Sequence, residues 1–147
     1  MSEILTEADT ERVFRILMLR IMDGAEKGVK WGANAWVDEA KNIAPVGTPK
    51  STGIPDYIIS EAYKRSLRRR PFRWVGPVAQ SGVSAGGYIV NPNTGRKVDY
   101  MVPLELGHSK QAPTGIVLQS AMNNREKILS RMAAGIRNQI FRGDIVI

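Results

Sequence analysis

The chain has 147 residues, of which 43% are hydrophobic and 24% are charged. This length and composition fit one compact domain with a hydrophobic core. The chain contains no cysteine and one histidine, which excludes disulfides, zinc fingers and thiol catalysis and leaves little room for a histidine-based metal site or proton relay. The longest apolar run, Ile16–Leu19, is far shorter than the roughly 20 residues that span a bilayer, and the acidic N-terminus is unlike a secretory signal. We therefore expect an intracellular protein with no membrane contact, no cofactor, no metal and no catalysis.

Charge is unevenly distributed along the chain. The sequence has 21 Lys and Arg against 14 Asp and Glu, a net charge of +7. Residues 1–60 contain 7 basic and 9 acidic side chains, a net of −2, whereas residues 61–147 contain 14 basic and 5 acidic ones, a net of +9. An asymmetry of this size bears on partners rather than on fold. We expect the basic part to meet nucleic acid or an acidic protein surface.

The first forty or so residues are predicted to be helical. Thr6 and Asp9 have the spacing of a capping box, in which each side chain binds a free backbone amide of the first turn. Apolar residues then recur at helical spacing as far as Ile43. Ala44-Pro45 ends the helix, because proline cannot continue the hydrogen-bond ladder and restricts the residue before it.

Three glycines within this helix, Gly24, Gly28 and Gly32, lie four residues apart. Each costs roughly 1 kcal/mol relative to alanine in a helix interior, so their register calls for an explanation. We interpret them as a bend or a close helix contact, with a subunit-contact face as the alternative.

The middle of the chain is predicted to contain loops, a short helix and strands. Residues 45–55 are rich in turn-forming residues and form an exposed, flexible loop, and residues 57–67 form a short helix. From Phe72 the apolar period changes to two, so residues 72–78 have the pattern of one half-buried strand. Glycines at 82, 86 and 87 mark a flexible loop at about 80–87.

Two further strands are expected at 88–90 and 98–104, and a helix from about Gly115 to Phe141, before a short tail at 142–147. Pro103 places the second strand at an edge or a bulge. The helix has an apolar stripe made of Leu118, Ala121, Ile128, Met132, Ile136 and Ile140. The order of elements predicts an α+β fold, in which a long N-terminal helix and a C-terminal helix pack on a small antiparallel β-sheet. We expect residues 1–147 to form a single domain.

One motif is similar to a catalytic site. The run from Gly82 to Gly86 matches the nucleophile elbow of α/β-hydrolases around Ser84, and Asp99 and His108 follow in the corresponding order. The elbow needs a helix directly after the serine, whereas residues 87–90 have a strand pattern. So short a stretch also cannot thread a parallel sheet. We therefore predict that the protein is not an enzyme.

Basic residues crowd between positions 64 and 73. They are Lys64, Arg65, Arg68, Arg69, Arg70 and Arg73. Arginine pairs with phosphate or carboxylate through two parallel hydrogen bonds, and neighbouring Phe72 and Trp74 offer rings for stacking. Three interpretations remain open for this segment: contact with an acidic protein partner, contact with a nucleic-acid backbone, or a solvated face.

Several short segments resemble a known family. The long predicted helix ends in Lys41-Asn42-Ile43-Ala44-Pro45-Val46, and a Thr-Gly loop and Tyr63-Lys64-Arg65-Ser66-Leu67 follow. Further on come Tyr100-Met101-Val102-Pro103-Leu104-Glu105-Leu106-Gly107-His108 and Gln111-Ala112-Pro113 before the last helix. Over residues 25–140 the chain resembles the head–tail joining, or tail-completion (neck), family of tailed bacteriophages. It departs from the family pattern by an insertion after Val46 and by Leu104 and His108 in place of the commoner Val and Thr.

This resemblance implies a structural virion component that forms a ring, commonly six-fold, between the capsid portal and the tail tube. The ring could be a tail terminator, a stopper or an adaptor. Its partners would be further copies of itself, as a hexamer, the neighbouring neck and tail-tube proteins, and genomic DNA in the channel without sequence preference. It would reside in the virion, and in the host cytoplasm during assembly. The alternative function is a basic nucleic-acid-binding accessory protein that uses residues 64–73.

Overall fold

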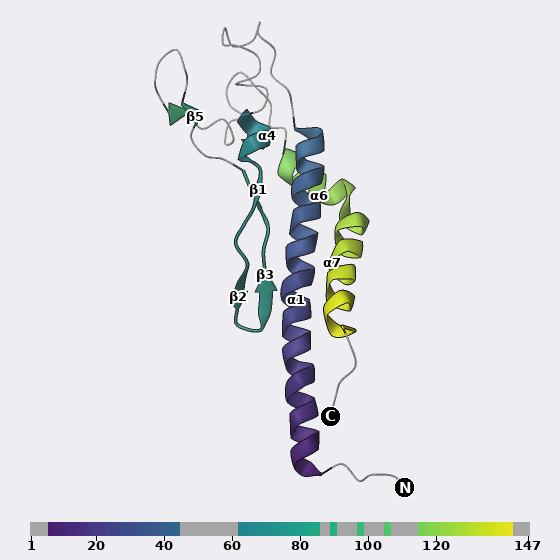
Figure 1. Cartoon of the computed structure of the whole chain (residues 1–147). Coiled ribbons are helices and arrows are strands. Elements are labelled where there is room, and N and C mark those ends of the chain that lie inside the picture. Colours follow the sequence, from purple (N-terminus) through teal and green to yellow (C-terminus); the bar gives the residue numbers. More distant parts are fainter. Residues whose placement is uncertain are drawn as a thin grey trace, which may run out of the picture.

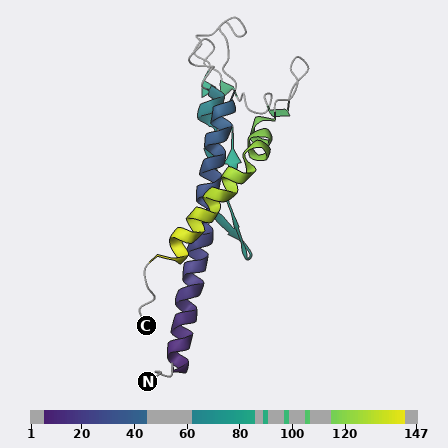
Figure 2. The same cartoon turned by 90° about the vertical axis from the view of Figure 1, so that its right-hand side faces the viewer.

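The computed structural model describes residues 6–44, 62–85, 89–90, 97–98, 105–106 and 115–142. A single long helix, α1 (Glu7–Ile43), is the axis of the molecule (Figure 1). A β-hairpin lies along one side of it and two C-terminal helices lie along another (Figures 1 and 2). The predicted α+β fold with long N- and C-terminal helices is confirmed, although the strands form two-stranded antiparallel pairs rather than one sheet.

Helix α1 begins and ends where the sequence predicts. The Asp9 amide donates to Thr6 Oγ1 at 3.2 Å, and the Thr6 amide donates to Asp9 Oδ2 at 3.1 Å, which completes the capping box. Ala44 is extended and ends the helix ahead of the proline. At 37 residues and 1.5 Å per residue, α1 is about 55 Å long. Its N-terminal part extends beyond both the hairpin and the C-terminal helices (Figures 1 and 2).

Helix α4 (Ala62–Ser66) leads into the hairpin. Strand β1 (Arg68–Arg69) pairs antiparallel with β4 (Val83–Ser84), and β2 (Arg73–Val75) pairs antiparallel with β3 (Val78–Gln80). The backbone N–H of Arg70 donates to the carbonyl of Gly82 at 2.7 Å and so joins the two ladders into one long hairpin. A separate short pair consists of β5 (Ile89–Val90) and β6 (Lys97–Val98), which confirms part of the two strands expected at 88–90 and 98–104.

The single strand predicted for residues 72–78 is wrong. The chain reverses at Gly76-Pro77, and Val75 pairs with Val78 across the turn. Gly76 has φ +57°, a value open to glycine, and proline can take only the second place of such a two-residue turn, which makes it type II′. Strand β2 is exposed along its length, so the half-buried pattern is also not realised.

The glycine-rich loop expected at about 80–87 is replaced in part by ordered hairpin, since Gly82 pairs with Arg70 and residues 83–84 form β4. Gly86 and Gly87 lie outside the described residues, as do the loop at 45–55, residues 57–61 of the predicted helix and residues 99–104 of the predicted strand.

The predicted C-terminal helix is two helices. Helix α6 (Ile116–Asn123) stops and α7 (Arg125–Ile140) starts at Asn124, whose φ and ψ of −118° and 23° are not helical. Both the backbone N–H and the side-chain amide of Asn124 donate to the Ser120 carbonyl at 3.2 Å, which closes the last turn of α6. The change of direction leaves Leu118 65% exposed, so the predicted continuous stripe is wrong there.

Helix α7 packs antiparallel against α1 on the three glycines. A Cβ built on Gly24 would meet Ile140, one on Gly28 would meet Ile136, and one on Gly32 would meet Met132. On the facing helix, a Cβ on Gly135 would lie 2.8 Å from the Cα of Gly28. The prediction of a close helix contact is therefore confirmed, and the alternative of a subunit-contact face is wrong because α7 covers these glycines.

A second contact region ties the hairpin and α6 to the C-terminal half of α1. Ala40, Leu67 and Ile116 are 0%, 2% and 4% exposed and pack together. Trp36 Nε1 donates to the Val117 carbonyl at 2.9 Å and lies 3.0 Å from the Ser120 hydroxyl. This region fixes where the hairpin lies along α1. Among the described residues, no helix has a stretch of the length and apolar character that crossing a membrane requires.

Candidate functional site

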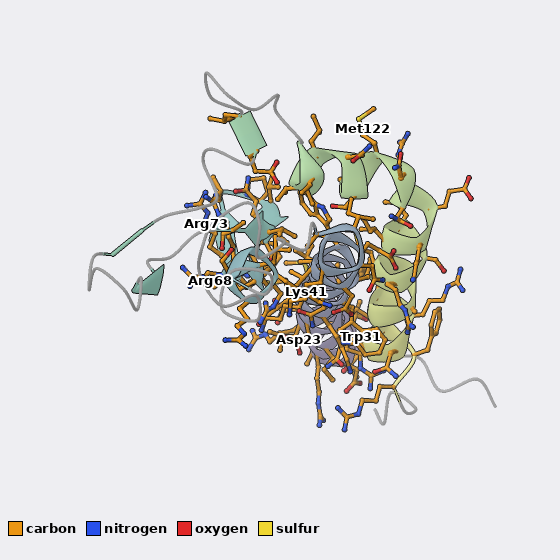
Figure 3. All side chains as sticks on the ribbon, turned by 90° about the horizontal axis from the view of Figure 1, so that it is seen from above. Asp23, Trp31, Lys41, Arg68, Arg73 and Met122 are labelled. Carbon is orange, nitrogen blue, oxygen red and sulfur yellow. The ribbon has the colours of Figure 1, made fainter. Side chains whose placement is uncertain are left out.

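Four of the six predicted site residues come together in one hollow. Arg68, Arg69, Arg70 and Arg73 line a depression of about 840 Å³ between the hairpin and α1. Seen down α1, Arg68 and Arg73 lie together on the hairpin side of this helix, and Met122 of α6 lies on a different side (Figure 3). We call this depression the arginine hollow.

The arginines of the hollow carry uncompensated charge. Among the described residues, none of the four forms an ion pair. Arg69 is half-buried, and its Nη1 is covered and has no hydrogen-bond partner in the described part of the chain. A covered polar nitrogen without a partner costs free energy, and like charges gathered without a counter-ion repel. Both observations point to an anionic ligand.

Hydrogen bonds within the hairpin hold the backbone of these arginines in place. The Ser81 hydroxyl donates to the Arg70 carbonyl at 2.8 Å, and the Ser84 hydroxyl donates to the Arg68 carbonyl at 3.4 Å. The register sets Arg68 opposite Ser84 and Arg69 opposite Val83.

Apolar side chains form the rest of the hollow. Trp36, Pro71, Phe72 and Val83 line it beside the arginines. Phe72 and Trp74 form an edge-to-face pair with ring centroids 5.5 Å apart, and Lys30 Nζ lies 5.4 Å from the Phe72 ring centroid. Trp74 is 39% exposed. The hollow therefore suits a ligand that combines an anionic end with an apolar part.

The other two predicted residues do not line the hollow. Lys64 and Arg65 lie on α4 and are exposed. Of the three interpretations of the basic segment, the solvated face describes Lys64. The arginines of the hollow are compatible with either an acidic protein partner or a nucleic-acid backbone.

A second surface is the N-terminal half of α1. Phe14 is 66% exposed, Met18 is 62% exposed and Ile21 is 55% exposed, in the part of the helix that extends beyond its neighbours (Figure 1). Glu7 and Glu11 precede them and are exposed, and neither pairs with a described residue. The pKa of Asp9 is lowered, chiefly because its carboxylate accepts hydrogen bonds from the Thr6 hydroxyl and amide.

Within the part of the chain that the structure describes, the motif around Ser84 does not form a nucleophile elbow. Ser84 lies on a strand and its hydroxyl is bonded to a backbone carbonyl, rather than standing at a strand-to-helix turn. Asp99 and His108 lie outside the described residues. Within the described ranges, no three Asp, Glu or His side chains gather in a way that could hold a metal ion.

Sequence reasoning missed Trp36 and the exposed face of α1. Trp36 lies among the apolar residues of the predicted helix, and nothing local distinguishes a core tryptophan from one that also lines a hollow. The exposed face could have been found in the sequence, because Phe14, Met18 and Ile21 continue the helical spacing of the apolar residues. Whether another element covers such a stripe depends on the length of α7, which ends at Ile140.

Neither family models nor curated proteins nor solved structures give a match to this chain.

Proposed function

We propose that the protein is a structural subunit of a tailed-bacteriophage virion, which forms a ring at the neck or the end of the tail and has no catalytic role. The sequence resemblance supports this proposal, and so does the nature of the two surfaces described above.

The observation that carries most weight is the bare apolar face of α1. Large apolar side chains at 14, 18 and 21 are more than half exposed on a part of the helix that no other described element covers. Soluble monomers rarely expose contiguous apolar patches larger than a few hundred Å² unless the patch binds a partner. A subunit that completes its packing only on assembly accounts for such a face.

The position of the two surfaces supports a ring. The arginine hollow lies at the C-terminal half of α1 and the apolar face at its N-terminal half, so the molecule has two different surfaces far apart. Subunits that join through two different patches form heterologous contacts, which close into rings when the rotation between subunits permits.

Electron microscopy of a lysate tests the proposal. The parent phage would carry a stop codon early in this gene. DNA-filled heads beside unattached tails would establish a joining role, and abnormally long tails would identify the tail terminator. Intact virions that infect normally would refute the proposal.

A second candidate function is nucleic-acid binding through the hollow. The exposed arginines 68, 70 and 73 stand beside the rings of Phe72 and Trp74, a combination that also suits single-stranded nucleic acid. Titration of the purified protein with DNA at several salt concentrations separates the two functions. A protein that neutralises several phosphates loses affinity steeply as salt rises, whereas a ring subunit binds free DNA weakly at all of them.

A further inference from the structure

We propose that the arginine hollow receives Glu7 and Glu11 from the α1 helix of a second copy of this chain. The inference rests on the proposed ring function and names the two surfaces that meet within it.

The hollow has the chemistry of a carboxylate site. Arg68, Arg69, Arg70 and Arg73 have no acidic partner among the described residues, and Arg69 Nη1 has no hydrogen-bond partner. A carboxylate that enters the hollow therefore gains charge-assisted hydrogen bonds without displacing an internal one. The apolar walls can cover the methylene groups of a glutamate.

The N-terminal half of α1 presents the complementary groups on one face. Glu7, Glu11, Phe14 and Met18 follow one another at intervals of four, three and four residues within the helix, and this spacing places them in a single row. All four are exposed. The row has two carboxylates at its start, neither paired with a residue that the structure describes, and two large apolar side chains after them.

The hairpin offers a matching row. Along the hairpin, Arg70 and Arg73 line the hollow, and the apolar pair Val75 and Val78, which are 47% and 51% exposed and face each other across the turn, lies at the tip. The five residue steps from Arg70 to Val75, of which Arg73–Val75 form β2, span about 16 Å where the backbone is extended. Eleven helical residues from Glu7 to Met18 at 1.5 Å each also span about 16 Å. The carboxylates of Glu7 and Glu11 can therefore meet the arginines at one end of the contact, while Phe14 and Met18 meet the apolar tip of the hairpin at the other end.

The glutamates must come from another molecule. Trp36 lines the hollow, and Glu11 lies 25 residues earlier in the same unbroken helix, which is about 37 Å along its axis. A DNA backbone would satisfy the arginines but would leave the apolar row of α1 and the apolar end of the hairpin uncovered. The second copy covers both.

Disulfide capture tests the contact directly, because the chain has no cysteine of its own. One preparation carries Thr10→Cys, an exposed position beside Glu7 and Phe14 that leaves both glutamates in place. The other carries Ser81→Cys, a residue that lines the hollow. The two are mixed and oxidised, and the linked dimer is measured by non-reducing electrophoresis and mass spectrometry. The control replaces Thr10→Cys with Asp23→Cys, an exposed position on the same helix but away from the acidic row.

We expect the Thr10→Cys pair to give at least about ten-fold more linked dimer than the control, since charge-assisted hydrogen bonds from the hollow to Glu7 and Glu11 hold the contact. Equal yields from the two pairs, or no linked dimer from either pair at the highest soluble concentration, would overturn the inference.

Charge exchange provides an independent test in the full-length protein. Glu7→Lys with Glu11→Lys changes only exposed side chains, so circular dichroism should show an unaltered fold while the capture yield falls. Combining that variant with an Arg70→Glu, Arg73→Glu partner should restore the yield. Failure to restore it would count against the contact.

Virion analysis keeps this inference separate from the proposed function. If the Glu7→Lys, Glu11→Lys variant enters virions in the same amount as the unchanged protein does, the contact is refuted and the structural role stands. If capture succeeds but virions lack the protein, the contact stands and the proposed function fails. If arginine variants lose DNA binding while the capture yield stays unchanged, the hollow is a nucleic-acid site and the inference is refuted.

Discussion

Alanine at Gly28 or at Gly135 should destabilise the protein, although alanine is the better helix former. At the crossing of α1 and α7, a Cβ on Gly28 would lie 2.6 Å from Ile136 Cγ1 and 2.8 Å from the Met132 carbonyl oxygen. A Cβ on Gly135 would lie 2.8 Å from the Cα and 3.0 Å from the N of Gly28. Backbone atoms of a helix cannot move aside as the end of a flexible side chain can, so the two helices must separate.

The expected magnitude follows from two opposing effects. Gly→Ala in a helix interior gains up to about 1 kcal/mol of helix propensity. Overpacking a well-filled contact costs about 1–3 kcal/mol, and here the separation also weakens the neighbouring contacts between α1 and α7. We expect a net loss of about 1–2 kcal/mol for either variant. Gly24→Ala is the matched control, because its Cβ meets Ile140 Cγ1 at 3.3 Å and the Ile136 carbonyl at 3.4 Å, contacts that small shifts relieve.

Urea and thermal unfolding followed by circular dichroism measure the series. For a chain of this size, each kcal/mol shifts the midpoint of thermal unfolding by roughly 2–4 °C. Gly28→Ala and Gly135→Ala should unfold several degrees below the unchanged protein, and Gly24→Ala within about one degree of it or above it. If Gly135→Ala were as stable as Gly24→Ala, the helices would not cross at this distance, and the packing argument would be wrong.

Three further predictions concern the hollow and the ends of the elements. Trp36→Phe keeps an aromatic side chain but removes the indole N–H that donates to the Val117 carbonyl and leaves a smaller ring, so unfolding in urea should show a loss of about 1–3 kcal/mol; an unchanged midpoint would contradict it. Gly76→Ala should lose about 1 kcal/mol or more because of its positive φ alone, since no atom lies within 4 Å of the added Cβ; a stabilised variant would mean that the turn has another form. Because the pKa of Asp9 is lowered from 3.8 in the folded protein, its contribution is complete above that value and lost as the pH falls through the lowered pKa. Asp9→Asn should therefore reduce the fall in the midpoint of thermal unfolding at acid pH, and an unaltered pH dependence would exclude this capping contribution.

Local chemistry was sufficient to predict α1. A capping box at Thr6 and a proline after Ala44 act within one turn of the helix ends, so the sequence determines both boundaries. The spacing of Gly24, Gly28 and Gly32 likewise indicated a close contact. The crowding of arginines at 68–73 also marked the candidate site, since a local excess of positive charge can be read directly from the sequence.

The turn at Gly76 and the break at Asn124 were not predicted, because alternation and helical spacing continue across both positions. A two-residue turn preserves the period of two, and a single non-helical residue shifts the helical stripe too little to be seen in the sequence.

Only the tertiary structure decided which surfaces remain bare. The apolar spacing of α1 is the same where α7 covers it and where nothing described does, and the difference arises because α7 starts at Arg125 and ends at Ile140. Hydrophobic burial depends on the neighbour that an element finds and not on the element itself. In the same way, folding the hairpin back along α1 brought Trp36 beside Arg69 and made a run of basic residues into a hollow with apolar walls.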